Sequence, residues 1–117
     1  MAAIDIKKEA KNPYGAYLLF GEEDYLKRYY ASEIRRAVVG DSPYAPFNHI
    51  LFSPDNFTAG AAADALVTPP VFEEKKLIEL CAFNFNELKA TETSALCDFL
   101  EEAKNYDYAV ILINIPS

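Results

Sequence analysis

Residues 16–26, which read AYLLFGEEDYL, join a short apolar run to three acidic residues and the beginning of a helix. The run at residues 16–20 is continuous rather than alternating, which is typical of a strand buried on both faces of a parallel sheet. Residues 24–39 then place apolar side chains at helical spacing. Acids stand at the start of this segment and Arg35 and Arg36 near its end, as the helix dipole favours. A buried strand that leads directly into a helix indicates an α/β fold.

The same alternation continues along the rest of the chain. Apolar runs predict strands at residues 47–52, 76–82 and 108–113, and helical spacing predicts helices at residues 59–67 and 92–104. A short polar helix or arm is expected at residues 4–11. Tyr29 and Tyr30 stand at core spacing on the first long helix, so they are expected to pack inward. We predict one α/β domain over residues 1–117, with a parallel sheet and helices on both of its faces.

The composition narrows the class of protein. The 117 residues are 51% hydrophobic, which is enough for a core, and carry a formal net charge of -7. A nucleic-acid module usually has the opposite charge, so the acidity favours protein partners, although it serves equally well as a solubility charge. Cys81 and Cys97 form no CxxC motif, and buried, reduced thiols are expected. No apolar run approaches the roughly 20 residues of a membrane helix, and we expect a cytoplasmic protein.

The last residues carry a further expectation. Residues 111–117 read ILINIPS, so the chain stops just after a strongly apolar run. Domains seldom end one step beyond a buried strand. We therefore expect a fragment of a longer protein, with a fold that is incomplete at its C-terminus.

The loop after the first strand is where open parallel sheets commonly bind phosphates. A phosphate-binding loop would read GxxxxGK[ST], and Gly21 and Lys27 fall in that register. However, Leu26 replaces the second glycine and Arg28 replaces the serine or threonine, while Glu22, Glu23 and Asp24 occupy the loop. Like charges about 4 Å apart repel by ~1 kcal/mol even in water. We therefore predict a degenerate loop that binds no nucleotide and no cofactor.

Two other kinds of site are also considered. A receiver domain would place acids after the first strand and a phosphorylatable Asp at the end of the third, but that strand ends in Cys81, Ala82, Phe83 and Asn84. His49 stands alone in an apolar strand and is expected to be a packed or surface residue. We predict no catalytic residue and no metal site.

An ordered set of segments resembles the N-terminal region of the DNA polymerase III delta subunit, a clamp-loader subunit. The matching segments are residues 17–26, Phe47-Asn48, and residues 63–66, 69–78, 99–101 and 108–113. The resemblance implies an AAA+-like domain of the P-loop NTPase type that has lost its ATP site. It also implies that the domain binds the sliding clamp (the beta subunit) and helps to open it, while neighbouring gamma/tau and delta prime subunits complete the loader. DNA would be met only through the whole complex.

The resemblance also implies a contact site. In that family an apolar pair after the short helix inserts into a hydrophobic groove of the clamp, and the matching positions are Val71 and Phe72, which follow Pro69 and Pro70. The prolines stiffen the approach and lower the entropy cost of presenting the pair. From the residues alone, packing of Phe72 into the domain's own core beneath the third strand is the favoured interpretation. The resemblance reverses that preference.

Three hypotheses about function therefore stand. The first is a non-catalytic clamp-loader domain that could not add nucleotides itself. The second is a phosphate- or nucleotide-binding α/β enzyme domain with a non-standard site. The third is an acidic adaptor domain unrelated to replication. Titration with ATP and magnesium separates the first from the second, and binding to the cognate clamp separates the first from the third.

Overall fold

The described part of the chain contains one parallel sheet with helices on both of its faces. The computed structural model describes residues 15–19, 24–41, 43–81, 83 and 89–114. Within them the sheet has the strand order β1-β4-β3-β2 and every neighbouring pair is parallel. The strands are β1 (Gly15–Leu19), β2 (His49–Phe52), β3 (Lys76–Cys81) and β4 (Ala109–Asn114). The predicted α/β class and the parallel sheet are confirmed.

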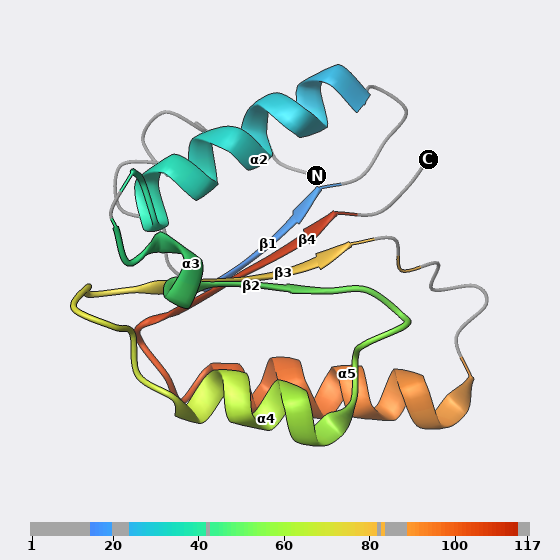
Figure 1. Cartoon of the computed structure of the whole chain (residues 1–117). Coiled ribbons are helices and arrows are strands. Elements are labelled where there is room, and N and C mark those ends of the chain that lie inside the picture. Colours follow the sequence, from blue (N-terminus) through green and yellow to red (C-terminus); the bar gives the residue numbers. More distant parts are fainter. Residues whose placement is uncertain (1–14, 20–23, 42, 82, 84–88, 115–117) are drawn as a thin grey trace.

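The helices form a layer on each side of this sheet (Figure 1). Helix α2 (Asp24–Val38) covers one face, while α4 (Ala59–Val67) and α5 (Ala90–Ala103) lie next to each other on the other face. A single helical turn, α3 (Ala45–Asn48), leads directly into β2. The predicted helices on both faces are confirmed, and α5 begins two residues earlier than its apolar spacing indicates.

Each face of the sheet contributes to its own hydrophobic core. Strands β3 and β4 are buried at five of their six positions, because both have a neighbour on each side and helices above and below. Ile78, Leu80 and Ile111 pack with α4 and α5. Leu77, Val110 and Leu112 pack on the other side, beneath α2. The side-chain period of two explains this division, since alternate residues of one strand face opposite layers.

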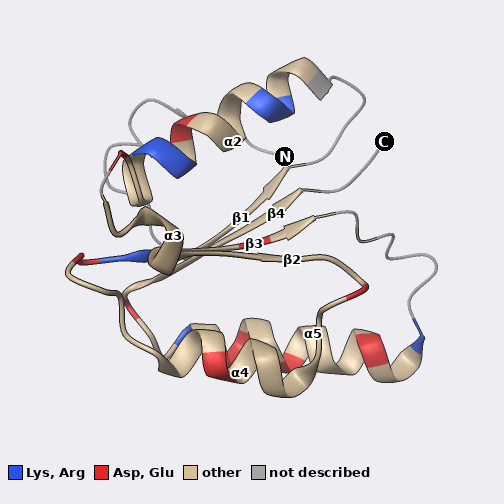
Figure 2. Cartoon of the chain, in the orientation of Figure 1, with Lys and Arg blue, Asp and Glu red and all other residues tan. Residues whose placement is uncertain are grey.

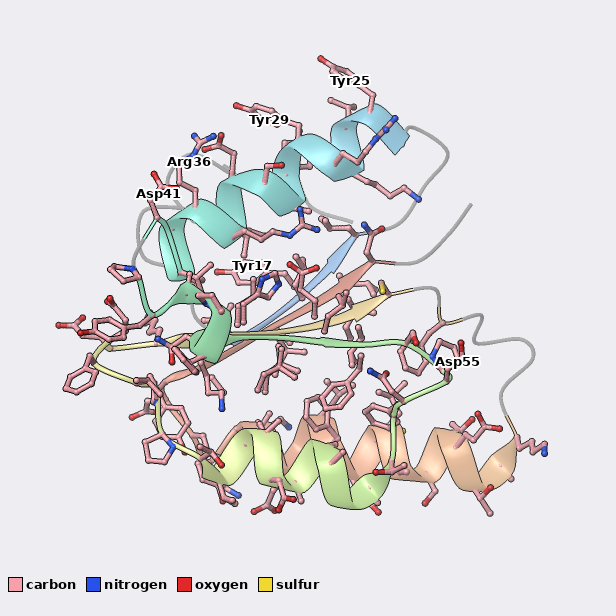
Figure 3. The ribbon with its side chains drawn as sticks, in the orientation of Figure 1. Tyr17, Tyr25, Tyr29, Arg36, Asp41 and Asp55 are labelled. Atoms are coloured by element: carbon pink, nitrogen blue, oxygen red, sulfur yellow. The ribbon has the colours of Figure 1, made fainter. Side chains whose placement is uncertain are left out.

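Two predictions about the first strand and helix are wrong. Strand β1 is not buried on both faces: Tyr17 is buried, but Leu18 is 42% exposed. In the described sheet β1 lies at an edge, with a strand on one side only. Tyr29 is also 44% exposed rather than packed inward, and with Tyr25 it points from α2 away from the sheet, whereas Tyr17 lies beneath the helix (Figure 3).

The strand predicted at residues 47–52 is shorter than expected. Phe47 and Asn48 belong to α3, and β2 begins only at His49. Pro46 lies in the first turn of α3, where its fixed φ suits a helix and its missing N–H costs nothing. The expected burial of the two cysteines is wrong, since Cys97 is exposed and Cys81 is only partly buried. The arm expected at residues 4–11 lies outside the described residues. Among the residues that are described, no helix is both long and apolar enough to cross a bilayer.

Candidate functional site

The segment between α4 and β3 presents the most exposed large apolar side chain in the described part of the chain. Phe72 is 81% exposed, and Val71 is only partly buried. Packing of Phe72 into the domain's own core is therefore excluded. Of the two prolines, Pro69 is exposed and Pro70 partly buried. The structure brings the four predicted residues together in one short surface segment, at the edge of the sheet where β3 begins (Figure 1).

The backbone of this segment is held by a side chain that is distant in the sequence. Asn48 is fully buried, and its Oδ1 accepts a hydrogen bond of 2.6 Å from the Val71 N–H. Its Nδ2 donates to the Val71 carbonyl at 3.0 Å. One amide group therefore satisfies both polar groups of one residue, which fixes the position of the chain just before Phe72.

Phe72 itself has an unusual backbone conformation. Its φ is +54°, the left-handed region that a non-glycine residue seldom occupies. Residues held there cost on the order of 1–2 kcal/mol and persist only where the surroundings impose them. The ring of Tyr44 packs against that of Phe72, with a centroid separation of 4.8 Å and an interplanar angle of 41°. The exposed position of Phe72 is therefore imposed by its surroundings.

Hydrogen bonds from Lys76 and Tyr108 hold the C-terminal end of α4, where the segment begins, next to the sheet. Lys76, the first residue of β3, is 2% exposed, and its Nζ donates to the carbonyls of Ala65 at 2.5 Å and Thr68 at 2.9 Å. The Tyr108 hydroxyl donates to the Leu66 carbonyl at 2.6 Å. Burial lowers the pKa of Lys76, but the negative end of the helix dipole favours a cation there. The end of α4 and the start of β3 thus form a fixed base for Phe72.

The loop after the first strand, which the sequence also singled out, is described only in part. Gly21, Glu22 and Glu23 are outside the described residues, and Asp24 begins α2. Since β1 ends at Leu19, this connection starts from the carboxyl edge of the sheet, opposite the edge that carries Phe72. Leu26 is partly buried and Lys27 is only 7% exposed. Leu26 and Lys27 therefore belong to the first turn of α2 and not to the segment that carries Phe72.

A charged cluster that the sequence did not predict lies under α2. Glu79, 5% exposed in the middle of β3, accepts hydrogen bonds from His49 Nε2 at 2.9 Å and from Arg35 Nε at 2.5 Å and Nη2 at 3.1 Å. Burial alone would raise the pKa of Glu79, but these hydrogen bonds and the charge of Arg35 outweigh it, so the pKa is lowered. The hydrogen bond to Glu79 likewise raises the pKa of Arg35. His49 is partly buried and bonded to Glu79, so it does not stand alone as the sequence indicated.

This cluster borders a surface pocket of about 460 Å³ between the end of α2 and α3. Arg35 and His49 line the pocket but are already bonded to Glu79, and Arg36 pairs with Glu33 at 3.1 Å. Basic residues are prominent on α2, whereas α4 and α5 carry mainly acidic ones (Figure 2). Within the described ranges, no group of three or more His, Cys, Asp or Glu side chains could hold a metal ion. The cluster acts as a brace between α2, β2 and β3.

Two solved structures have the same fold over nearly the whole chain. The Bacillus subtilis DNA clamp loader delta protein YqeN is 27% identical, with a TM-score of 0.73 over 96% of this chain. The resemblance to a clamp-loader delta subunit is confirmed. A DNA polymerase III gamma subunit-related protein from Thermotoga maritima is 20% identical, with a TM-score of 0.65 over 94% of this chain, and supports the fold alone. The expected AAA+-like clamp-loader fold is thereby confirmed.

The extent of the match is limited on the other side. This chain covers 34% of the delta protein and 38% of the gamma-related protein, so it spans about a third of the length of each. Comparisons with models of protein families and with curated protein sequences find no match.

Proposed function

We propose that this chain is the clamp-binding domain of a bacterial clamp-loader delta-type subunit, and that it helps to open the sliding clamp during DNA replication. The observation that carries the proposal is the presentation of Phe72. The side chain of Phe72 is 81% exposed, and its ring packs against that of Tyr44. The backbone of Phe72 is held in the strained left-handed region. Without a binding partner, this conformation would lower the stability of the fold and no contact would compensate for it. The similarity to a clamp-loader delta protein supports a clamp as that partner.

The energetics fit a small anchor that enters an apolar groove. Burying a phenylalanine side chain contributes roughly 1.5–3 kcal/mol by area. Aromatic residues near the centre of an interface commonly dominate its affinity. Val71 is partly buried and its N–H and carbonyl bond Asn48, so we assign it mainly an anchoring role and Phe72 the main contact. Pro69 and Pro70 restrict the backbone that leads to them.

We also propose that the domain is not an enzyme and binds no cofactor. Leu26 and Arg28 replace the residues that a phosphate-binding loop requires, and Lys27, which falls in register with its lysine, is largely buried. In this proposal ATP is bound by neighbouring loader subunits, and DNA is reached only through the assembled complex. The domain would act in the cytoplasm with the rest of the replication machinery.

Two calorimetric titrations of the whole chain test the proposal. Titration with the cognate sliding clamp is expected to show saturable binding, and titration with ATP and magnesium is expected to show no heat of binding. Nucleotide binding without clamp binding would contradict the proposal in favour of a nucleotide-binding α/β enzyme. Binding of neither would leave the acidic adaptor as the better hypothesis.

A further inference from the structure

We infer that α3, together with Tyr44 before it, is a positioning element that presents Phe72 before any partner arrives. Asn48 at the end of α3 fixes the backbone of Val71, and Tyr44 at its beginning supports the ring of Phe72. The inference rests on the proposed function and deepens it, because it assigns roles to residues outside the contact segment.

The position of Asn48 is hard to explain by packing alone. Its side chain is 0% exposed, and both of its polar ends bond one residue that is 23 positions away. A buried amide is retained at little cost only when its donor and acceptor are both satisfied. A leucine would fill similar space, but it would leave the N–H and carbonyl of Val71 without these partners. Asn48 is therefore suited to hold a loop in one place.

Tyr44 acts on the next residue along the same loop. It is the residue before α3, and its ring lies 4.8 Å from that of Phe72. The four residues of α3 separate it from β2, and Pro46 restricts the backbone of that turn. One rigid turn thus sets the spacing between the group that fixes Val71 and the ring that supports Phe72. The φ of +54° at Phe72 marks the point where the loop is constrained.

A pre-ordered loop binds more tightly because less conformational entropy is lost on association. If α3 supplies that order, removing the Asn48 amide leaves the Phe72 side chain present but no longer held in one position. We expect Asn48→Ala to weaken binding of the cognate clamp roughly tenfold, mainly through ordering cost. In a Phe72→Ala background the same change should have almost no effect, because the side chain that it positions is gone.

Asn56→Ala is the matched control. Asn56 also bonds two backbone groups of a loop, accepting from Ser53 N at 2.7 Å and donating to the Leu51 carbonyl at 3.2 Å. It lies in the loop that follows β2, at the opposite edge of the sheet. Asn56→Ala is expected to leave clamp affinity unchanged. Equal losses from Asn48→Ala with and without Phe72, or no loss at all, would overturn the inference.

A second measurement needs no clamp and so separates failure of this inference from failure of the proposed function. Nuclear magnetic resonance of the free chain is expected to show faster amide exchange at Val71 and loss of the Tyr44–Phe72 ring contact in Asn48→Ala. Amides of β3 and β4 should keep their protection. Unchanged exchange at Val71 would contradict a positioning role even if the clamp binds.

Should Asn48→Ala fail to fold, Tyr44→Ala takes its place. This change is expected to weaken clamp binding several-fold through the same ordering cost, and Tyr44→Phe, which keeps the ring, is expected to restore it. Wild-type affinity in Tyr44→Ala would overturn the inference.

Discussion

Replacing Glu79 with glutamine probes the brace that holds α2 to the sheet. The carboxylate is almost fully buried and accepts hydrogen bonds from His49 and from two nitrogens of Arg35. Hydrogen bonds to a charged group contribute about 1.5–3 kcal/mol each. Two effects reduce the total: the side chain of Arg35 is 40% exposed, which screens its pairing, and glutamine keeps one acceptor oxygen. We expect Glu79→Gln to lower the free energy of unfolding by about 2 kcal/mol.

The effect should depend on pH in one direction. The pKa of Glu79 is lower in the folded chain than its ordinary value, so the stabilisation is complete above the unfolded pKa of about 4.3. It is lost as the pH falls through the folded pKa, because the protonated carboxyl no longer pairs. The difference in stability between wild type and Glu79→Gln should therefore be full at pH 7 and shrink below about pH 4.

Urea unfolding followed by circular dichroism measures the loss of unfolding free energy in Glu79→Gln and its dependence on pH. A thermal melt at pH 7 should show a decrease in Tm of roughly 10 °C. Glu33→Gln is the matched control, since Glu33 forms a more exposed pair with Arg36 within α2 and should change stability by less than about 0.5 kcal/mol. Equal stability of Glu79→Gln and wild type at pH 7, or a difference that does not change with pH, would refute the reasoning.

Three further substitutions test individual contacts by urea unfolding. Tyr108→Phe removes the hydroxyl that donates to the Leu66 carbonyl and should cost about 1 kcal/mol, and no change would show that this end of α4 is not held there. Thr58→Ala removes the N-cap whose Oγ1 accepts from Ala61 N and should also cost about 1 kcal/mol, which Thr58→Ser should largely recover. Gly40→Ala forces a side chain onto a residue with φ +55°, 3.3 Å from the Arg36 carbonyl, and should cost about 1–2 kcal/mol, so a neutral result would contradict that backbone conformation.

The regular elements were predictable where local patterns decide them. Strands β3 and β4 lie within one residue of the predicted limits, because they are central strands whose apolar runs reflect burial on both faces. The pattern failed at Phe47 and Asn48, since a short apolar run does not distinguish a strand from a helical turn. It also failed at Leu18, because exposure there depends on the position of β1 in the sheet and not on its own sequence.

The candidate site was only partly predictable for the same physical reason. Val71 and Phe72 were identified through their resemblance to a family, and the structure adds that Phe72 is exposed. The contacts that hold the site and the brace under α2 were missed, because their partners are distant in sequence: Asn48 at the site bonds a residue 23 positions away, and Arg35 in the brace bonds one 44 positions away. The sequence did contain a signal for Lys76, which begins a strand predicted to be buried. A lysine is almost never fully buried unless its charge is satisfied, so partners for this side chain could have been expected.

The central claim is that Phe72 grips a sliding clamp, and equilibrium binding of the cognate clamp to Phe72→Ala tests it most directly. The account predicts an affinity loss on the order of 30-fold, as for an aromatic hot spot. Stability should change by less than about 0.5 kcal/mol, because the side chain is exposed. Tyr25→Ala, which removes an aromatic ring that is 72% exposed on α2, should bind as tightly as wild type. Equal affinity of wild type, Phe72→Ala and Tyr25→Ala would contradict the claim.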